Sequence, residues 1–212
     1  MRRLAILFVS MVVCAGVFAQ KQLVVLHTND THSRIVPVPK YENNADVSGR
    51  GGFVRRAAVV RDERVKDPDL LLFDSGDFSQ GSTYYTLFRG DVEIGLMNLM
   101  GYDAATLGNH EFDYGTDVLA SLLKKADAQY LNATIEYTGN GNNLLKDTVP
   151  YVIERFGFLD VAFIGVSTPE SITKSTPRYF MEDGQFVYDF AAGEDLYAAV
   201  QGYVDEVREK GA

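Results

Sequence analysis

Four short, uninterrupted runs of apolar residues constrain the fold of this chain more than any other feature. The runs are residues 23–26, 70–73, 104–107 and 161–166. A strand with one solvated face alternates apolar and polar residues, whereas a short continuous run is typical of a strand buried on both faces. Segments with helical periodicity lie between the runs, so the sequence predicts an α/β sandwich.

Four segments between and after these runs are predicted to form helices, because each presents one apolar face. In residues 52–65 that face includes Phe53 and Val60. Thr116 is the expected N-cap of another helix, with Asp117 in its first turn. The remaining two predicted helices are residues 91–100 and residues 194–210.

Two polar segments interrupt the alternation of strands and helices. Residues 37–51 contain two prolines and end in a glycine-rich stretch, and residues 137–147 are rich in glycine and asparagine. Both compositions are typical of loops. There are no internal repeats, and no domain boundary is indicated within residues 20–212.

The first 19 residues are similar to a secretory signal peptide. Arg2 and Arg3 precede the apolar stretch 4–18, and residues 17–19 fit a small-residue cleavage site. The stretch is short for a membrane span, and no second one follows. The sequence therefore predicts secretion or export to the periplasm, cleavage before Gln20, and no stable membrane insertion after cleavage.

Charge limits the partners that the chain can bind. The net charge is −9, and removal of Arg2 and Arg3 leaves 18 basic residues (20 minus 2) against 29 acidic ones, a charge of −11. An acidic chain is a poor general binder of nucleic acid or anionic membranes. Phosphate substrates are compatible with this charge where metal ions supply the local positive charge. Cys14, the only cysteine, lies within the signal region, so the exported chain has no disulfide.

Polar residues with the chemistry of metal ligands follow three of the apolar runs. They lie in residues 27–33, 74–78 and 108–111. Ligands of open α/β sheets bind at the carboxyl ends of the strands, so the three clusters are expected to converge on one edge. Asp30 and His32 are two residues apart, and in an extended segment they would point the same way and hold one metal ion.

The types of these side chains suggest a site for two divalent ions. The carboxylate of Asp77 could bridge the ions, with Asp30 and His32 on one side and the amide oxygen of Asn109 on the other. Such a mixture of oxygen and imidazole ligands suits Zn²⁺, Mn²⁺ or iron. Two metal ions roughly 3.5–4 Å apart polarise a phosphoryl group and generate hydroxide at neutral pH.

A proton donor follows the predicted ligand Asn109 directly. His110 would either stabilise charge on the phosphoryl oxygens or protonate the leaving alcohol, and Asp113 would hold its tautomer and orient its ring. We expect Glu111 to support its neighbours rather than bind metal directly. We expect His27, at the end of an apolar run, to be a hydrogen-bonded structural histidine.

At these residues the chain resembles the N-terminal metallophosphatase domain of the 5'-nucleotidase family, which also includes 2',3'-cyclic-nucleotide phosphodiesterases. The segments that carry the resemblance are residues 23–33, 76–82 and 102–113, with looser similarity at 130–133 and 163–166. Three motifs in this order and at this spacing are specific. The resemblance covers nearly all of the chain after the signal region.

The resemblance implies a metallophosphatase-type α/β sandwich that hydrolyses phosphate esters of nucleotides with two divalent metal ions. One ion is implied at Asp30, His32 and Asp77, and the other at Asp77 and Asn109. His110 and Asp113 are implied as a catalytic dyad. Each position carries the residue type of the family motif.

The chain also departs from the family pattern. Family members carry further metal-binding histidines on the next strand and in a Gly-His-x-His motif, whereas no histidine follows His110 here. The resemblance also implies a C-terminal nucleotide-recognition domain in the family, which we expect residues 20–212 to lack. We therefore expect residues 20–212 to be the N-terminal portion of a metallophosphatase domain, truncated before its later strands and weakly active or inactive. The alternatives are a non-catalytic exported domain that binds metal or ligand, and a metallophosphoesterase for cyclic or non-nucleotide esters.

Overall fold

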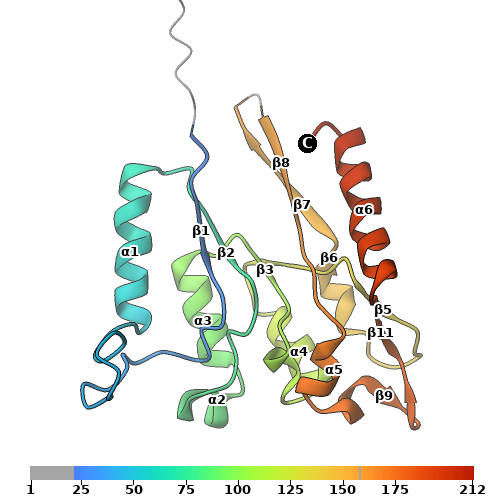
Figure 1. Cartoon of the computed structure of the whole chain (residues 1–212), viewed down its shortest axis with the longest axis horizontal. Helices are drawn as coiled ribbons and strands as arrows, with labels where there is room; N and C mark the ends of the chain where they lie inside the picture. Colours follow the sequence, from blue (N-terminus) through green and yellow to red (C-terminus); the bar gives the residue numbers. More distant parts are fainter. Residues whose placement is uncertain (1–21, 158) are drawn as a thin grey trace, which may run out of the picture.

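A five-stranded parallel sheet forms the centre of the computed structural model, which describes residues 22–157 and 159–212 (Figure 1). Its strand order is β1-β2-β3-β4-β6. The strands are β1 (Val25–Thr28), β2 (Leu71–Asp74), β3 (Ala104–Thr106), β4 (Gln129–Leu131) and β6 (Thr148–Val149). The predicted α/β fold is confirmed, and the first three apolar runs form its first three strands with ends shifted by at most two residues.

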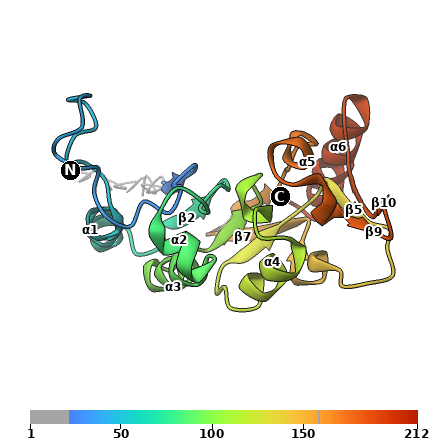
Figure 2. The ribbon, with the colours of Figure 1, turned by 90° about the horizontal axis from the view of Figure 1, so that it is seen from below.

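The helices that join these strands pack on one face of the sheet (Figure 2). They are α1 (Phe53–Lys66), α2 (Thr83–Phe88), α3 (Asp91–Met100) and α4 (Thr116–Leu123). The predictions for the helices at 52–65 and 91–100 are confirmed. The predicted N-cap at Thr116 is wrong, because Gly115 occupies the cap with a φ of 90° that favours glycine. The hydroxyl of Thr116 instead donates to the carbonyl of Tyr179.

The C-terminal part of the chain adds smaller elements beside this sheet. The strands β7 (Tyr151–Phe156) and β8 (Leu159–Ile164) form an antiparallel hairpin, against which α6 (Glu194–Glu209) packs. The run at 161–166 was expected to be a strand buried on both faces, and this expectation is wrong, since β8 is only half-buried. The remaining elements are β5 (Ile135–Tyr137) paired with β11 (Tyr188–Phe190), β9 (Met181–Glu182) paired with β10 (Gln185–Phe186), and α5 (Glu170–Lys174).

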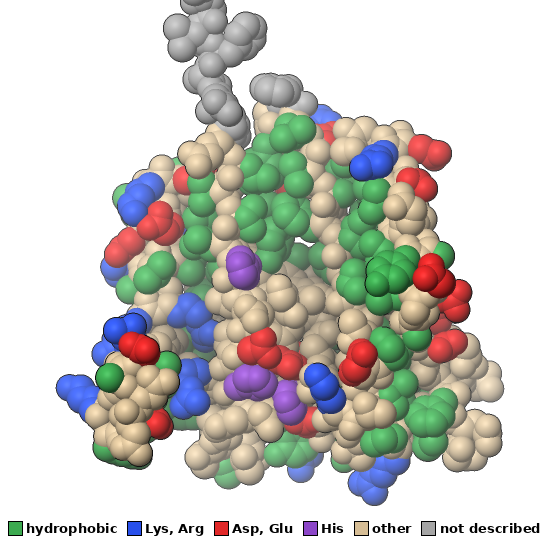
Figure 3. Space-filling view, viewed as in Figure 1, with side chains coloured by type: hydrophobic (Ala, Val, Ile, Leu, Met, Phe, Trp, Pro, Cys, Tyr) green, Lys and Arg blue, Asp and Glu red, His purple; other side chains and the backbone are tan. Residues whose placement is uncertain are grey.

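The sheet face opposite α1 and α3 is partly open. An apolar hollow of about 370 Å³ lies between β1–β3 and β8, and the tilted rings of Phe73 and Phe163 are in contact there, with ring centroids 4.3 Å apart. Apolar side chains surround the hollow in Figure 3. Val25 and His27 are exposed on this face, and Leu26 and Thr28 on the other face are half-buried, so the expectation that β1 is buried on both faces is wrong. The expected hydrogen bond of His27 is not formed with any described residue.

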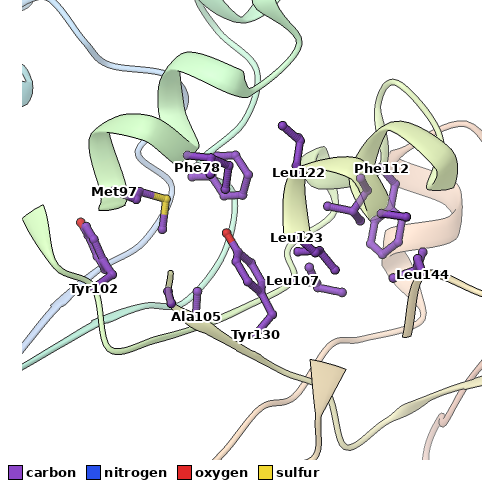
Figure 4. Close-up of a cluster of buried hydrophobic side chains, with 14 of the residues drawn as sticks. Phe78, Met97, Tyr102, Ala105, Leu107, Phe112, Leu122, Leu123, Tyr130 and Leu144 are labelled. Carbon is purple, nitrogen blue, oxygen red and sulfur yellow. The ribbon is translucent and has the colours of Figure 1, made fainter. Parts of the chain in front are cut away.

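The buried core lies between the sheet and the helices, and it also fixes the loops that follow the strands (Figure 4). Phe78 follows β2, and Leu107 and Phe112 flank the loop after β3; none is more than 2% exposed. Burial of a side chain of this size contributes about 1.5–3 kcal/mol. The loops at the strand ends are therefore anchored by apolar side chains next to their polar ones.

In the described part of the chain, no helix is long and apolar enough to cross a membrane. The predicted signal peptide at residues 1–19 lies outside the described residues.

Candidate metal centre

The loops that follow β1, β2 and β3 meet at the carboxyl edge of the parallel sheet, as their placement predicted. Asp30, His32 and Asp77 each offer one ligand atom, and these atoms lie within 4.8 Å of one another. Nε2 of His32 lies 3.5 Å from Oδ1 of Asp30. The rings of His32 and His110 are also close, with centroids 5.2 Å apart. We call Asp30, His32 and Asp77 the metal cluster.

The backbone of the metal cluster is left-handed rather than extended. The φ values are 49° at Asp30, 41° at His32 and 57° at Asp77, and the adjacent Ser33 also has a φ of 49°. Backbone hydrogen bonds hold this geometry, since Asp30 N donates to Gly76 O and His32 N donates to Asp77 O, both at 3.0 Å. The structure therefore brings Asp30 and His32 together, but the extended segment assumed from the sequence is wrong.

Asp77 joins the loop after β2 to the loop after β3. Its Oδ1 accepts a hydrogen bond of 2.9 Å from the backbone N–H of His110. Gly108 makes this approach sterically feasible, because a Cβ at that position would lie 2.2 Å from Oδ1 of Asp77. The sequence feature that permits the contact is therefore the glycine that precedes Asn109.

A short 3₁₀ helix, η1 (His110–Phe112), places His110 and Asp113 on one face, because side chains three residues apart eclipse in this helix. Nδ1 of His110 lies 2.8 Å from Oδ2 of Asp113, and the other oxygen of Asp113 accepts from Ser175 Oγ at 3.5 Å. The hydrogen-bonded pair predicted from the sequence is present. Because Nδ1 is hydrogen-bonded to Asp113, Nε2 is the ring nitrogen of His110 that can face a substrate.

Asn109 immediately precedes η1 and is half-buried. Its side-chain amide makes no hydrogen bond to any residue that the structure describes, so its oxygen is free to accept a further partner. The role of Asn109 as a metal ligand stays a prediction.

Glu111 is a fully buried carboxylate that holds two of the loops together. Its Oε2 accepts from the backbone N–H groups of Asp77 at 2.8 Å and Gly108 at 2.6 Å, and its Oε1 accepts from Ser79 N at 3.2 Å. Burial, together with the negative charge of Asp77, raises the pKa of Glu111 to about 8. These hydrogen bonds agree with the expected supporting role. Both carboxylate oxygens of Glu111 accept from backbone N–H groups, so Glu111 is not a member of the metal cluster.

A second buried carboxylate, Glu93, lies behind the metal cluster and is not indicated by the sequence. It accepts from Ser33 Oγ, which also lies 2.5 Å from Ser82 Oγ at the N-cap of α2. Glu93 stands in the first turn of α3, where an acidic residue ordinarily interacts with the helix dipole. No spacing in the sequence shows that this one instead reaches the turn next to His32.

Asp74, at the end of β2, gives a testable dependence of stability on pH. It is 3% exposed, accepts from Thr28 Oγ1 at 2.5 Å and Gly76 N at 2.9 Å, and burial raises its pKa from 3.8 to about 6. Because the folded state favours the protonated form, this stabilisation is present below pH 3.8 and is lost as pH rises through about 6.

The unfolding free energy of the wild type, relative to Asp74→Asn, should therefore fall by roughly 2–3 kcal/mol between about pH 4 and pH 7. Urea denaturation of both proteins at several pH values measures this difference. Asp62→Asn, an exposed change on α1, is the control and should follow the wild type. Equal pH dependence of the wild type and Asp74→Asn would contradict the prediction.

A parallel sheet that gathers carboxylates and imidazoles at its strand ends has the architecture of a metallophosphoesterase. The chain belongs to the calcineurin-like phosphoesterase family, whose family model matches residues 23–199.

Its curated relatives include 5'-nucleotidases. The snake venom 5'-nucleotidase of Gloydius brevicauda is 37% identical over 175 residues, which are 80% of this chain and 29% of that protein. The 5'-nucleotidase of Bos taurus is 36% identical over 160 residues, covering 74% of this chain and 28% of that protein. The chain thus spans less than a third of the length of these relatives.

Solved structures agree with the sequence relatives. The 5'-nucleotidase precursor of Thermus thermophilus has a TM-score of 0.74 and 30% identity, covering 90% of this chain and 35% of that one. The NAD nucleotidase of Haemophilus influenzae has a TM-score of 0.73 and 27% identity, covering 89% of this chain and 32% of that one. The predicted resemblance to 5'-nucleotidases and the metallophosphatase-type fold are confirmed.

Proposed function

We propose that this chain is the metal-binding part of an exported hydrolase that cleaves phosphate esters of nucleotides. The observation that carries the proposal is the metal cluster at the sheet edge, with the pair of His110 and Asp113 beside it. The relatives named 5'-nucleotidases support nucleotides as the substrate class.

The side chains at this edge fit divalent metal ions. Two carboxylates and an imidazole within 4.8 Å suit Zn²⁺ or Mn²⁺. Nδ1 of His32 is buried and has no hydrogen-bond partner among the described residues. In our proposal Asp30, His32 and Asp77 hold one ion, and Asp77 and Asn109 hold a second. The second ion has only two protein donors, one of them shared, so it should bind more weakly than the first.

The bound ions would supply Lewis acidity, which polarises the phosphoryl group and lowers the pKa of a coordinated water. The protein supplies orientation and a proton. Asp113 holds Nδ1 of His110, and Nε2 either donates a hydrogen bond to the phosphoryl oxygens or protonates the leaving alcohol. The hydrogen bond from the backbone N–H of His110 to the carboxylate of Asp77 holds His110 beside the metal cluster.

The proposal is tested by measuring metal content and phosphate release in the same preparation. After loading with Mn²⁺ or Zn²⁺, the chain should retain metal and release phosphate only slowly from a nucleoside monophosphate, because the second ion has few protein donors, and a chelator should abolish both. A 2',3'-cyclic nucleotide assayed in parallel separates the two substrate types. Retained metal with no release from any ester would refute catalysis and identify a metal-binding domain.

His110→Asn should lower kcat by about 10²–10³ without changing metal affinity, because it removes the proton donor and no ligand of the metal cluster. Asp113→Asn should have a smaller effect, about tenfold, because the ring stays but its orientation and tautomer are less fixed. His27→Asn is the matched control, since His27 lies in the apolar hollow. Equal kcat values for His110→Asn and His27→Asn would contradict this role of His110.

We also propose that residues 1–19 direct export and are then removed. Expression of the whole chain in a bacterial host should place the protein outside the cytoplasm, with Gln20 as the first residue by mass spectrometry. Retention of Met1 in the exported protein would contradict this proposal.

A further inference from the structure

An open cleft of about 600 Å³ lies beside the metal cluster, between the loop after β1 and the start of α1. It shares Asp30 and His32 with the metal cluster. Arg34, Arg55 and Arg56 line the rest of its polar surface, and we call it the arginine cleft. Figure 3 shows Lys and Arg side chains gathered next to the acidic and histidine side chains at the lower end of the strands.

The charge of the arginine cleft is opposite to that of the whole chain. Asp30 is the only carboxylate among the residues that line it, against three guanidinium groups, whereas the chain as a whole carries −9. Two other arginines in the described part of the chain pair with acids, Arg61 with Asp62 and Arg155 with Asp160. None of the three cleft arginines has a carboxylate within ion-pair distance among the described residues. The positive charge of Arg34 and Arg55 is therefore available to a ligand, whereas the charge of Arg56 also acts on the buried Asp74, where it opposes the rise in pKa that burial causes.

One of the arginines is held in place without losing its charge. Arg55 donates through Nη1 to the backbone carbonyls of Gly49 and Gly51. Nε of Arg56 is buried and has no partner among the described residues. In addition, α1 begins beside the cleft at Gly52 with no side-chain cap and no acidic residue in its first turn. The N–H of Phe53 donates to Ile35 O, and the next N–H groups of the first turn add to the positive potential of the guanidinium groups.

We propose that the arginine cleft binds a second phosphate group of a ligand that carries two or more phosphates. A guanidinium fork matches the oxygens of a phosphate in geometry and charge. The volume is in the range of small-molecule sites and holds more than one phosphate. Since the cleft shares Asp30 and His32 with the metal cluster, a phosphate chain can extend from one to the other. The role of the arginine cleft as part of a substrate site rests on the proposed function. Binding of the phosphate chain itself does not require catalysis.

The test is titration calorimetry of the metal-free chain with inorganic pyrophosphate and, separately, inorganic phosphate, in the presence of a chelator. Pyrophosphate should bind at least about tenfold more tightly than phosphate, and its affinity should fall as the salt concentration rises. Arg55→Gln and Arg56→Gln should each weaken pyrophosphate binding by about tenfold. Arg61→Gln, on the same helix but paired with Asp62, should bind as the wild type does.

Arg55 is exposed, so Arg55→Gln should fold normally. This variant keeps the test valid if Arg56→Gln, at a half-buried position, does not fold. Asp77→Asn separates the two proposals, because it removes a metal ligand but no residue of the arginine cleft. Pyrophosphate binding that survives Asp77→Asn supports the inference, even if no hydrolysis is ever detected. Binding that is unchanged in both Arg55→Gln and Arg56→Gln, or lost in metal-free Asp77→Asn, would overturn it.

Discussion

Replacement of Asp77 by asparagine should abolish metal binding and phosphate-ester hydrolysis together. Asp77 is the carboxylate of the metal cluster that also reaches the loop after β3, through its bond to His110 N. Asparagine keeps an oxygen for that bond but loses the negative charge that both proposed ions require. We expect metal affinity to fall at least about 100-fold, and kcat to fall below detection.

Calorimetric titration with Mn²⁺ and elemental analysis after dialysis measure the loss of metal. Asp62→Asn, which removes one exposed carboxylate from α1, should leave both quantities unchanged. Thermal unfolding of the two metal-free variants shows whether Asp77→Asn is folded. A folded Asp77→Asn that keeps the wild-type amount of metal would disprove the proposed site.

Replacement of Glu111 by alanine should cause the largest loss of stability of any single change at the site. Three backbone N–H groups, those of Asp77, Ser79 and Gly108, would lose their acceptor in a region that water reaches poorly. Each unsatisfied buried donor costs about 1–3 kcal/mol, so the total for three donors is roughly 3–9 kcal/mol. Because domains are stable by only about 5–15 kcal/mol, Glu111→Ala should be near the limit of folding.

Urea denaturation at neutral pH measures the effect of Glu111→Ala. Glu111→Gln should be intermediate, because its single amide oxygen can accept only part of the three bonds. Glu136→Ala, at an exposed position of β5, is the control and should change the unfolding free energy by less than about 0.5 kcal/mol. A loss below about 1 kcal/mol in Glu111→Ala would show that the loops do not depend on this carboxylate.

Much of the fold could be predicted because its signals are local. The runs that became β2 and β3 are apolar apart from Thr106, and they are covered on the helix side by α1, α3 and α4. The prediction failed where burial depends on distant parts of the chain. A continuous apolar run does not show that β8 would join β7 in a hairpin, or that the face of β1 bearing Val25 would stay exposed.

The residues that gather in the metal cluster could be predicted from the sequence, but the backbone geometry that holds them could not. Asp30, His32 and Asp77 could be identified because each follows an apolar run, and parallel strands bring such positions to one edge. The left-handed backbone of Asp30 and His32 depends on hydrogen bonds to the loop after β2, which no local pattern contains. The contact of Glu93 with Ser33 joins residues 60 positions apart and has no sequence signal.

The left-handed conformations at the metal cluster have a consequence for how this protein could evolve. Asp30, His32, Ser33 and Asp77 occupy a region where a side chain costs of order 1 kcal/mol and glycine costs almost nothing. Selection for heat resistance alone would therefore favour glycine at these positions, whereas chemistry at the sheet edge requires side chains there. Thermostable descendants that keep their chemistry should acquire compensating changes in the core, far from this turn.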